Sequence, residues 1–116
     1  MATIKSYTNL EQSKKLAEIL PLESADMYFE PSTGFCTEPS EVRVGDIKYA
    51  HPRSVPCWSL AALMRVLPKI VNTQTLFIET SAALWHIGYR DVYIARSENL
   101  VDACVDMIIK LNELKI

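Results

Sequence analysis

The stretch from Pro56 to Pro68, which reads PCWSLAALMRVLP, constrains the fold of this 116-residue chain more than any other. Only Ser59 and Arg65 within it are clearly polar, so a helix here would present apolar surface on almost every side and would have to be buried. Proline suits the first turn of a helix but cannot continue one. The two prolines therefore predict a buried helix that starts at Pro56 and ends near Val66 or Leu67.

Helices are also predicted near both ends of the chain. Thr8 and Glu11 have the spacing of a capping box, which would begin an amphipathic helix that Pro21 stops. Ser97 is expected to cap the last helix. Its apolar residues are Leu100, Val101, Ala103, Cys104, Val105, Met107, Ile108, Ile109, Leu111 and Leu114. One neighbour would not cover so wide an arc, so this helix should lie on a sheet and also touch the helix at 56–68 or a second subunit.

Short strands are predicted where aromatic and β-branched residues cluster between turn residues. The segments are 27–29, a hairpin of 42–44 and 47–49 around Gly45 and Asp46, and three closely joined strands at 75–79, 83–89 and 92–95. Strands joined so closely favour antiparallel pairing. We therefore expect one α+β domain over residues 1–116, with a mostly antiparallel sheet of about five strands and three helices packed against it.

Charge and composition exclude several classes of function. The formal net charge of −2 provides no general attraction to nucleic acid or to an anionic membrane. The first residues do not resemble a signal peptide, and no apolar run approaches the ~20 residues that span a bilayer. Cys36, Cys57 and Cys104 are widely separated and odd in number, which is typical of reduced thiols. These features predict a cytoplasmic protein with no membrane partner.

Cys57 is the candidate nucleophile. It stands at the expected start of a helix, where unpaired N–H groups and the helix dipole would stabilise a thiolate. His51 lies nearby in the sequence and His86 could approach through the fold, so a Cys57/His51 or Cys57/His86 pair is the enzyme hypothesis. The alternatives are a buried structural thiol and a structural or surface histidine. No metal or cofactor is expected, because the cysteines and histidines are not at ligand spacings and the glycines form no phosphate-binding loop.

Candidate binding residues lie between the first strand and the helix at 56–68. Arg43, Lys48 and Arg53, with Tyr49 among them, would form a basic patch able to contact phosphates or stack on bases. Interleaved acidic residues dilute that patch, and the alternative is a solvated hairpin edge whose charges discourage aggregation. Tyr28 belongs to a large set of aromatic residues, of which an exposed cluster would indicate a protein partner.

Three pieces of the chain, LPLESADM, PCWSLAALMRVLP and VDACVDMIIKL, carry a family resemblance. In this order and spacing they resemble a set of short uncharacterised proteins of gut bacteria and of their phages and mobile elements. That family has no assigned activity, so no functional residue is carried over. The resemblance implies an accessory cytoplasmic protein that acts on host or competing factors by binding them.

The leading hypothesis is therefore a small protein-binding module, homodimeric through its C-terminal helix or bound to another protein. It depends on the wide apolar arc of that helix, the many aromatic residues and the lack of a catalytic constellation. The alternatives are an enzyme or ligand-binding protein that uses Cys57, and nucleic-acid binding through residues 43–53. We expect the functional surface on residues 30–55 or on the exposed edge of the sheet.

Overall fold

The computed structural model describes residues 5–30, 41–46, 48 and 53–115. In chain order the elements are α1 (Leu10–Ala17), the 3₁₀ helix η1 (Leu22–Ser24), β1 (Met27–Glu30), β2 (Glu41–Val44), β3 (Val55–Cys57), α2 (Leu60–Val66), β4 (Ile70–Val71), β5 (Gln74–Thr75), β6 (Phe77–Ser81), β7 (Leu84–Tyr89), β8 (Tyr93–Ser97) and α3 (Leu100–Leu114). The α+β class and the antiparallel pairing are confirmed. The described strands form three separate sheets, however, rather than one sheet of about five strands.

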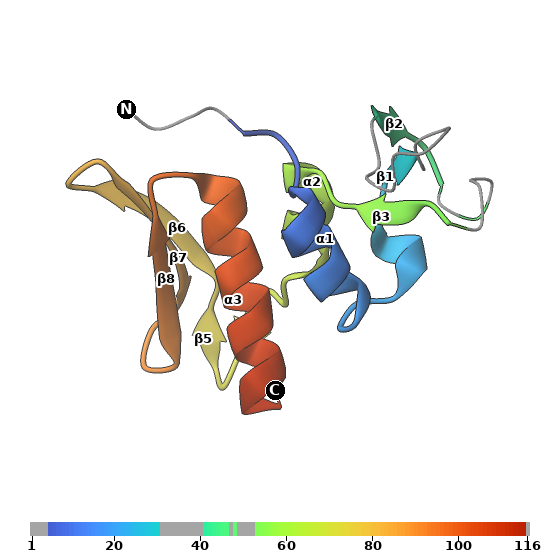
Figure 1. The fold of residues 1–116 in the computed structure, drawn as a ribbon. Helices are drawn as coiled ribbons and strands as arrows, with labels where there is room; N and C mark the ends of the chain where they lie inside the picture. The colour runs from blue at the N-terminus through green and yellow to red at the C-terminus, as the bar shows by residue number, and fades with distance from the viewer. Residues whose placement is uncertain (1–4, 31–40, 47, 49–52, 116) are drawn as a thin grey trace.

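The two three-stranded sheets lie on opposite sides of the helices (Figure 1). On one side, β1 pairs with both β2 and β3, and α1 packs against β3. On the other, β6, β7 and β8 form an antiparallel meander, and α3 packs on β7 and β8. Helix α2 lies between the two sides and contacts α3. The short β4–β5 hairpin leads into the meander.

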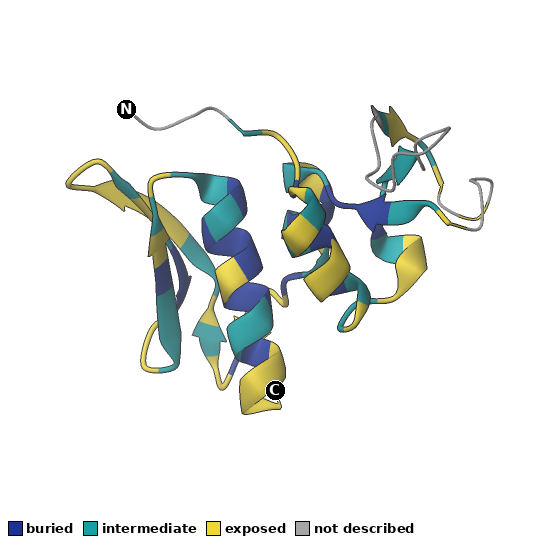
Figure 2. Ribbon diagram, in the orientation of Figure 1, coloured by how far each residue is buried: buried dark blue, intermediate teal, exposed yellow. Residues whose placement is uncertain are grey.

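One hydrophobic core joins the helices to the meander (Figure 2). It includes Leu16 of α1, Leu63 of α2, Ile87 of β7 and Met107 of α3, with Trp58 fully buried ahead of α2. The predicted contacts of the last helix with a sheet and with the helix of the 56–68 stretch are confirmed. The wide apolar arc that suggested a second subunit is therefore largely covered within one chain.

The helix predicted from Pro56 begins later than expected. Residues 55–57 form β3, and the helix starts after Ser59, whose Oγ accepts a hydrogen bond from the N–H of Ala62 at 3.2 Å. β3 is an edge strand of its sheet, where a proline that cannot donate a hydrogen bond is tolerated. The predicted end near Val66 or Leu67 is confirmed, but Ala61 and Arg65 are exposed, so this helix is buried on one side only.

The first helix is capped by Asn9 rather than by Thr8. Asn9 and Gln12 form the capping box: Asn9 Oδ1 accepts from the Gln12 N–H at 2.8 Å, and Gln12 Oε1 accepts from the Asn9 N–H at 3.0 Å. The Thr8 hydroxyl is buried instead, where it accepts a hydrogen bond from the N–H of Trp58 at 3.1 Å. The predicted pair of Thr8 and Glu11 is therefore wrong by one residue.

The last helix is capped by Asn99 rather than by Ser97. Asn99 Oδ1 accepts from the N–H groups of Val101 at 2.8 Å and Asp102 at 3.3 Å. Ser97 ends β8, and its hydroxyl accepts from the N–H of Asn99 at 3.2 Å. The helix therefore begins two residues later than expected.

The strand predicted at 42–44 pairs with β1, whereas the sequence predicts a return strand at 47–49 as its partner. β2 pairs with β1, with Phe29 opposite Val42, and the Gly45 N–H donates to the carbonyl of Asp26 at 2.9 Å. The proposed return strand at 47–49 lies largely outside the described residues. The apolar residues of β1 provide the cross-strand contacts that stabilise a sheet.

Candidate functional site

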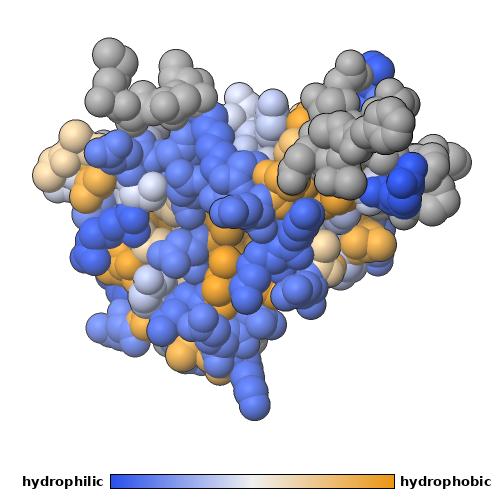
Figure 3. All heavy atoms as spheres, viewed as in Figure 1, coloured by the Kyte–Doolittle hydropathy of each residue, from blue (hydrophilic) through white to orange (hydrophobic). Residues whose placement is uncertain are grey.

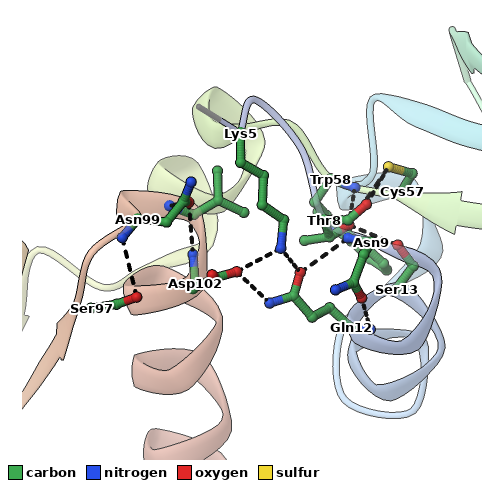
Figure 4. A network of polar contacts seen from close by, with 11 residues as sticks. Lys5, Thr8, Asn9, Gln12, Ser13, Cys57, Trp58, Ser97, Asn99 and Asp102 are labelled. Carbon is green, nitrogen blue, oxygen red and sulfur yellow. Dashed lines mark hydrogen bonds and ion pairs between the residues drawn. The ribbon is translucent and has the colours of Figure 1, made fainter. Parts of the chain in front are cut away.

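Cys57 lies in a buried polar cluster rather than at a helix N-terminus (Figure 4). Its side chain is fully buried, its Sγ donates to the carbonyl of Thr8 at 3.4 Å, and the Thr8 hydroxyl donates to Sγ at 3.6 Å. Burial raises the pKa of the Cys57 thiol, and hydrogen bonds from Thr8 and Ser13 offset only part of that rise. The thiol is therefore protonated and closed to solvent at neutral pH.

The two histidines do not complete a catalytic pair among the described residues. His86 lies in β7, in a different sheet from Cys57, and its Nε2 is 3.4 Å from the carbonyl oxygen of Ser81. His51 lies outside the described residues. In the part of the chain that the structure describes, no three His, Cys, Asp or Glu residues are placed to hold a metal ion. No described helix is long and apolar enough to cross a membrane.

The candidate binding residues are brought together only in part. Tyr28 and Arg43 lie opposite each other in β1 and β2, on the same face of that sheet. Arg43 Nε is 3.3 Å from Glu30 Oε1, and Lys48 Nζ is 3.6 Å from an oxygen of Asp46. Arg53 is exposed in the turn before β3, and Tyr49 lies outside the described residues. Arg43 and Lys48 thus each lie beside a carboxylate.

A small apolar hollow lies where α1, α2 and α3 end. Figure 3 shows hydrophobic atoms between α3 and α1 on the face that it presents. The hollow measures about 230 Å³ and is lined by Ile19, Leu20, Val66, Leu67, Pro68, Ile108, Leu111 and Asn112. Ligand pockets are typically ~300–1,000 Å³ and contain several convergent polar groups. With Asn112 as its one polar side chain, this hollow does not resemble one.

The most exposed strand of the meander is β6. It lies at one edge of the sheet order β6–β7–β8, and no described strand pairs with its other side. Ile78, Glu79, Thr80 and Ser81 are all exposed. An exposed edge strand presents unpaired backbone groups, which makes it a template for the addition of another strand.

The register of the hairpin shows which backbone groups of β6 are unpaired. The two-residue turn at 82–83 closes on Ser81, and hydrogen-bonded and non-hydrogen-bonded pairs alternate from there along the ladder. Glu79 therefore exchanges hydrogen bonds with β7. Ile78 and Thr80 direct their N–H and C=O groups away from β7, toward the free edge.

An apolar pair adjoins this edge. Ile78 is opposite Ile87 and Thr80 is opposite Trp85, so the side chains of Ile78 and Trp85 are diagonal neighbours on the α3 side of the sheet. Helix α3 packs on β7 and β8, which leaves Ile78 38% and Trp85 37% exposed. Figure 2 shows the tip of the β6–β7 hairpin projecting away from α3, with much of the tip exposed. We call Ile78, Glu79, Thr80 and Trp85 the β6 surface.

The sequence predicts the general features of the β6 surface but not its residues. An exposed sheet edge and an exposed aromatic residue were both expected, and the segment 83–89 was expected to be a strand. Nothing local in the sequence distinguishes β6 from β7 as the edge, because the order of strands depends on pairings between residues distant in sequence.

The fold and the β6 surface define a small α+β protein in which no described strand pairs with the exposed edge of β6. Comparisons with protein-family models, with curated proteins and with solved structures find no match for the chain. The resemblance to short proteins of gut bacteria and mobile elements therefore stays a prediction.

Proposed function

We propose that this protein is a binding module that captures a partner protein by adding an extended segment of that partner to β6. The observation that carries the proposal is the edge of β6, with which no other strand in the described residues pairs, beside the exposed pair of Ile78 and Trp85. Main-chain hydrogen bonds supply affinity in this mode of recognition, and side-chain contacts supply specificity. Tryptophan is also among the residues that most often dominate binding energy at protein interfaces.

The energetics fit a moderate, reversible interaction. Each hydrogen bond made by Ile78 and Thr80 would contribute about 0.5–1.5 kcal/mol, and burial of the exposed parts of Ile78 and Trp85 would add to this. Association itself costs several kcal/mol in lost freedom of motion. Contacts with surface beyond the edge would therefore strengthen the complex.

The other hypotheses have less support. An enzyme that uses Cys57 requires an accessible thiolate, whereas this thiol is buried and its pKa is raised. A homodimer through α3 depended on its apolar arc, most of which the chain itself covers. We also propose a cytoplasmic location, which the buried free thiols of Cys57 and Cys104 support. The proposed role there is that of an accessory protein that binds host or competing factors.

Replacing Thr80 with proline tests the proposal. The Thr80 N–H points to the free edge, so Thr80→Pro removes an edge donor and obstructs strand addition without removing a hydrogen bond to β7. We expect the wild type to capture a partner protein from native host lysate and Thr80→Pro to capture at least tenfold less of it. The reason is that two edge hydrogen bonds of about 1 kcal/mol each are disrupted. Quantitative mass spectrometry of the captured proteins measures this.

Thr80→Val is the matched control, because it changes the same side chain and keeps the N–H. It should retain the partner, and thermal unfolding should show that Thr80→Pro remains folded. A partner held equally by the proline variant would place binding elsewhere on the molecule. Failure of the folded wild type to capture any protein would also count against the proposal.

A further inference from the structure

The charge at the centre of β6 indicates what kind of segment the edge accepts. We infer that β6 selects an extended peptide with a lysine or arginine opposite Glu79 and apolar residues on either side of that cation. This inference rests on the proposed function and names the chemistry of the partner. It follows from the register of β6, its side-chain pattern and the position of the one carboxylate on the strand.

The register brings the incoming residue close to Glu79. Because Ile78 and Thr80 would make the hydrogen bonds to an added antiparallel strand, the residue opposite Glu79 would occupy a non-hydrogen-bonded pair. Side chains in such pairs approach most closely, with Cβ atoms ~4.5–5.5 Å apart. A cation at this position would meet the Glu79 carboxylate directly.

The cations on the same face are farther from the incoming residue than the Glu79 carboxylate is. The Arg90 guanidinium lies over the Phe77 ring, 4.6 Å from its centroid, and Phe77 is two residues from Glu79 along β6. Glu79 is opposite His86 in β7, and His86 is opposite Arg96 in β8, so Arg96 lies two strands from Glu79 and three from the added strand. At ~4.8 Å per strand, Arg96 would be roughly 14 Å from the incoming residue, beyond the Debye length of ~8 Å at physiological salt. The nearer carboxylate therefore determines the preference.

The neighbouring positions face the apolar pair. Residues on either side of the cation would point to the opposite face of the sheet, where Ile78 and Trp85 are exposed. Apolar side chains there would cover the exposed parts of both residues. The preferred segment thus alternates apolar, basic, apolar.

The same geometry disfavours a second copy of this chain as the occupant. Antiparallel pairing of β6 with β6 of another copy, over the full strand, places Glu79 opposite the copy's own Glu79. Like charges directly opposite each other are destabilising. An edge charge of this kind also protects a strand from self-association.

A display library of random nonapeptides tests the inference. Clones are selected on the wild type and then sorted by loss of binding to Thr80→Pro. We expect clones that depend on the edge to be enriched in a basic residue between two apolar ones. Synthetic peptides with lysine, glutamine or glutamate at that position should bind in that order, and lysine should exceed glutamine by about two- to fivefold, less at high salt.

Charge reversal at Glu79 separates this inference from the proposed function. Glu79→Lys should invert the order of the three peptides, and Glu79→Gln should abolish it. Peptides that depend on the edge but show no basic preference, or that keep their order in Glu79→Lys, would overturn the inference and leave the proposed function intact. If no selected clone is sensitive to Thr80→Pro, strand addition itself is wrong.

Discussion

At the scale of single residues, burial determines the chemistry of Cys57. The sequence placed this thiol at a helix N-terminus, where its pKa would fall, whereas the structure places it in β3 and raises the pKa. The reversal follows from a cap only two residues away: Ser59 begins the helix, so Cys57 remains extended. A backbone change this small turns a candidate nucleophile into a core residue.

This reading of Cys57 makes a prediction about labelling. Because the side chain is fully buried and hydrogen-bonded to Thr8, Cys57 should not react with a thiol reagent in the folded protein and should react fully in denaturant. Peptide mapping by mass spectrometry after a short pulse of reagent measures this residue by residue. Cys104, also buried and with its pKa raised to about 12, is the internal control and should behave in the same way. Rapid labelling of Cys57 alone, increasing with pH below pH 9, would revive the nucleophile hypothesis.

At the scale of elements, the β6–β7 hairpin carries backbone strain in its turn. Ala82 and Ala83 both have positive φ angles, 53° and 65°. Two-residue hairpins of this kind favour asparagine or glycine at these positions, because a left-handed backbone brings Cβ close to the carbonyl oxygen. The hairpin therefore forms because β6 and β7 pair well along their length, and not because its turn residues favour it.

A glycine in this turn should relieve the strain and stabilise the protein. Ala83→Gly should raise the free energy of unfolding by about 0.5–1 kcal/mol, since glycine adopts positive φ without the steric cost. Ala61→Gly is the matched control, because the same substitution at an exposed position in α2 should lower stability by about 1 kcal/mol. Urea unfolding of both variants measures the two effects. A destabilising Ala83→Gly would show that the turn is not strained as described.

At the scale of the whole molecule, a polar network joins the chain ahead of α1 to α3. Lys5 Nζ is 2.6 Å from Asp102 Oδ1 and donates to Gln12 Oε1 at 2.6 Å, while Gln12 Nε2 donates to Asp102 Oδ1 at 2.7 Å (Figure 4). The three residues come from the N-terminal segment, α1 and α3. Burial opposes ionisation of Asp102, but the hydrogen bonds from Lys5 and Gln12 and the Lys5 charge outweigh it and lower its pKa.

This network predicts a pH dependence of stability. The pKa of Asp102 in the folded chain is below its ordinary 3.8, so its contribution is present above that value and is lost as pH falls through the folded pKa. A double-mutant cycle of Lys5→Met and Asp102→Asn, measured by urea unfolding, should give a coupling of about 0.5–1 kcal/mol at neutral pH, limited by solvent screening. The coupling should weaken as pH falls below 3.8 and should be lost once pH has passed through the lowered folded pKa of Asp102. A coupling unchanged at acid pH would show that the contact does not depend on charge.

Periodicity predicted the larger elements because they are encoded locally. The spacing of apolar residues within α3 predicts its buried arc, and the short connections between the last three strands predict the meander. The caps were missed at both ends because Thr8, Asn9, Ser97 and Asn99 are all good N-cap residues, and local sequence does not choose among them. Thr8 does not cap α1, because its hydroxyl is hydrogen-bonded within the cluster around Cys57. That cluster forms only when residues about fifty positions apart in the sequence come together.

The amino-acid sequence by itself determined the α+β class, the position of the buried arc and the absence of a recognised catalytic signature. Only the tertiary structure decided that β1 pairs with both β2 and β3, that Cys57 is buried, and that β6 is left at an edge with Ile78 and Trp85 exposed. The physical reason is that a pattern of apolar residues specifies which face of an element is buried. Which neighbour covers that face depends on competition among segments distant in the chain.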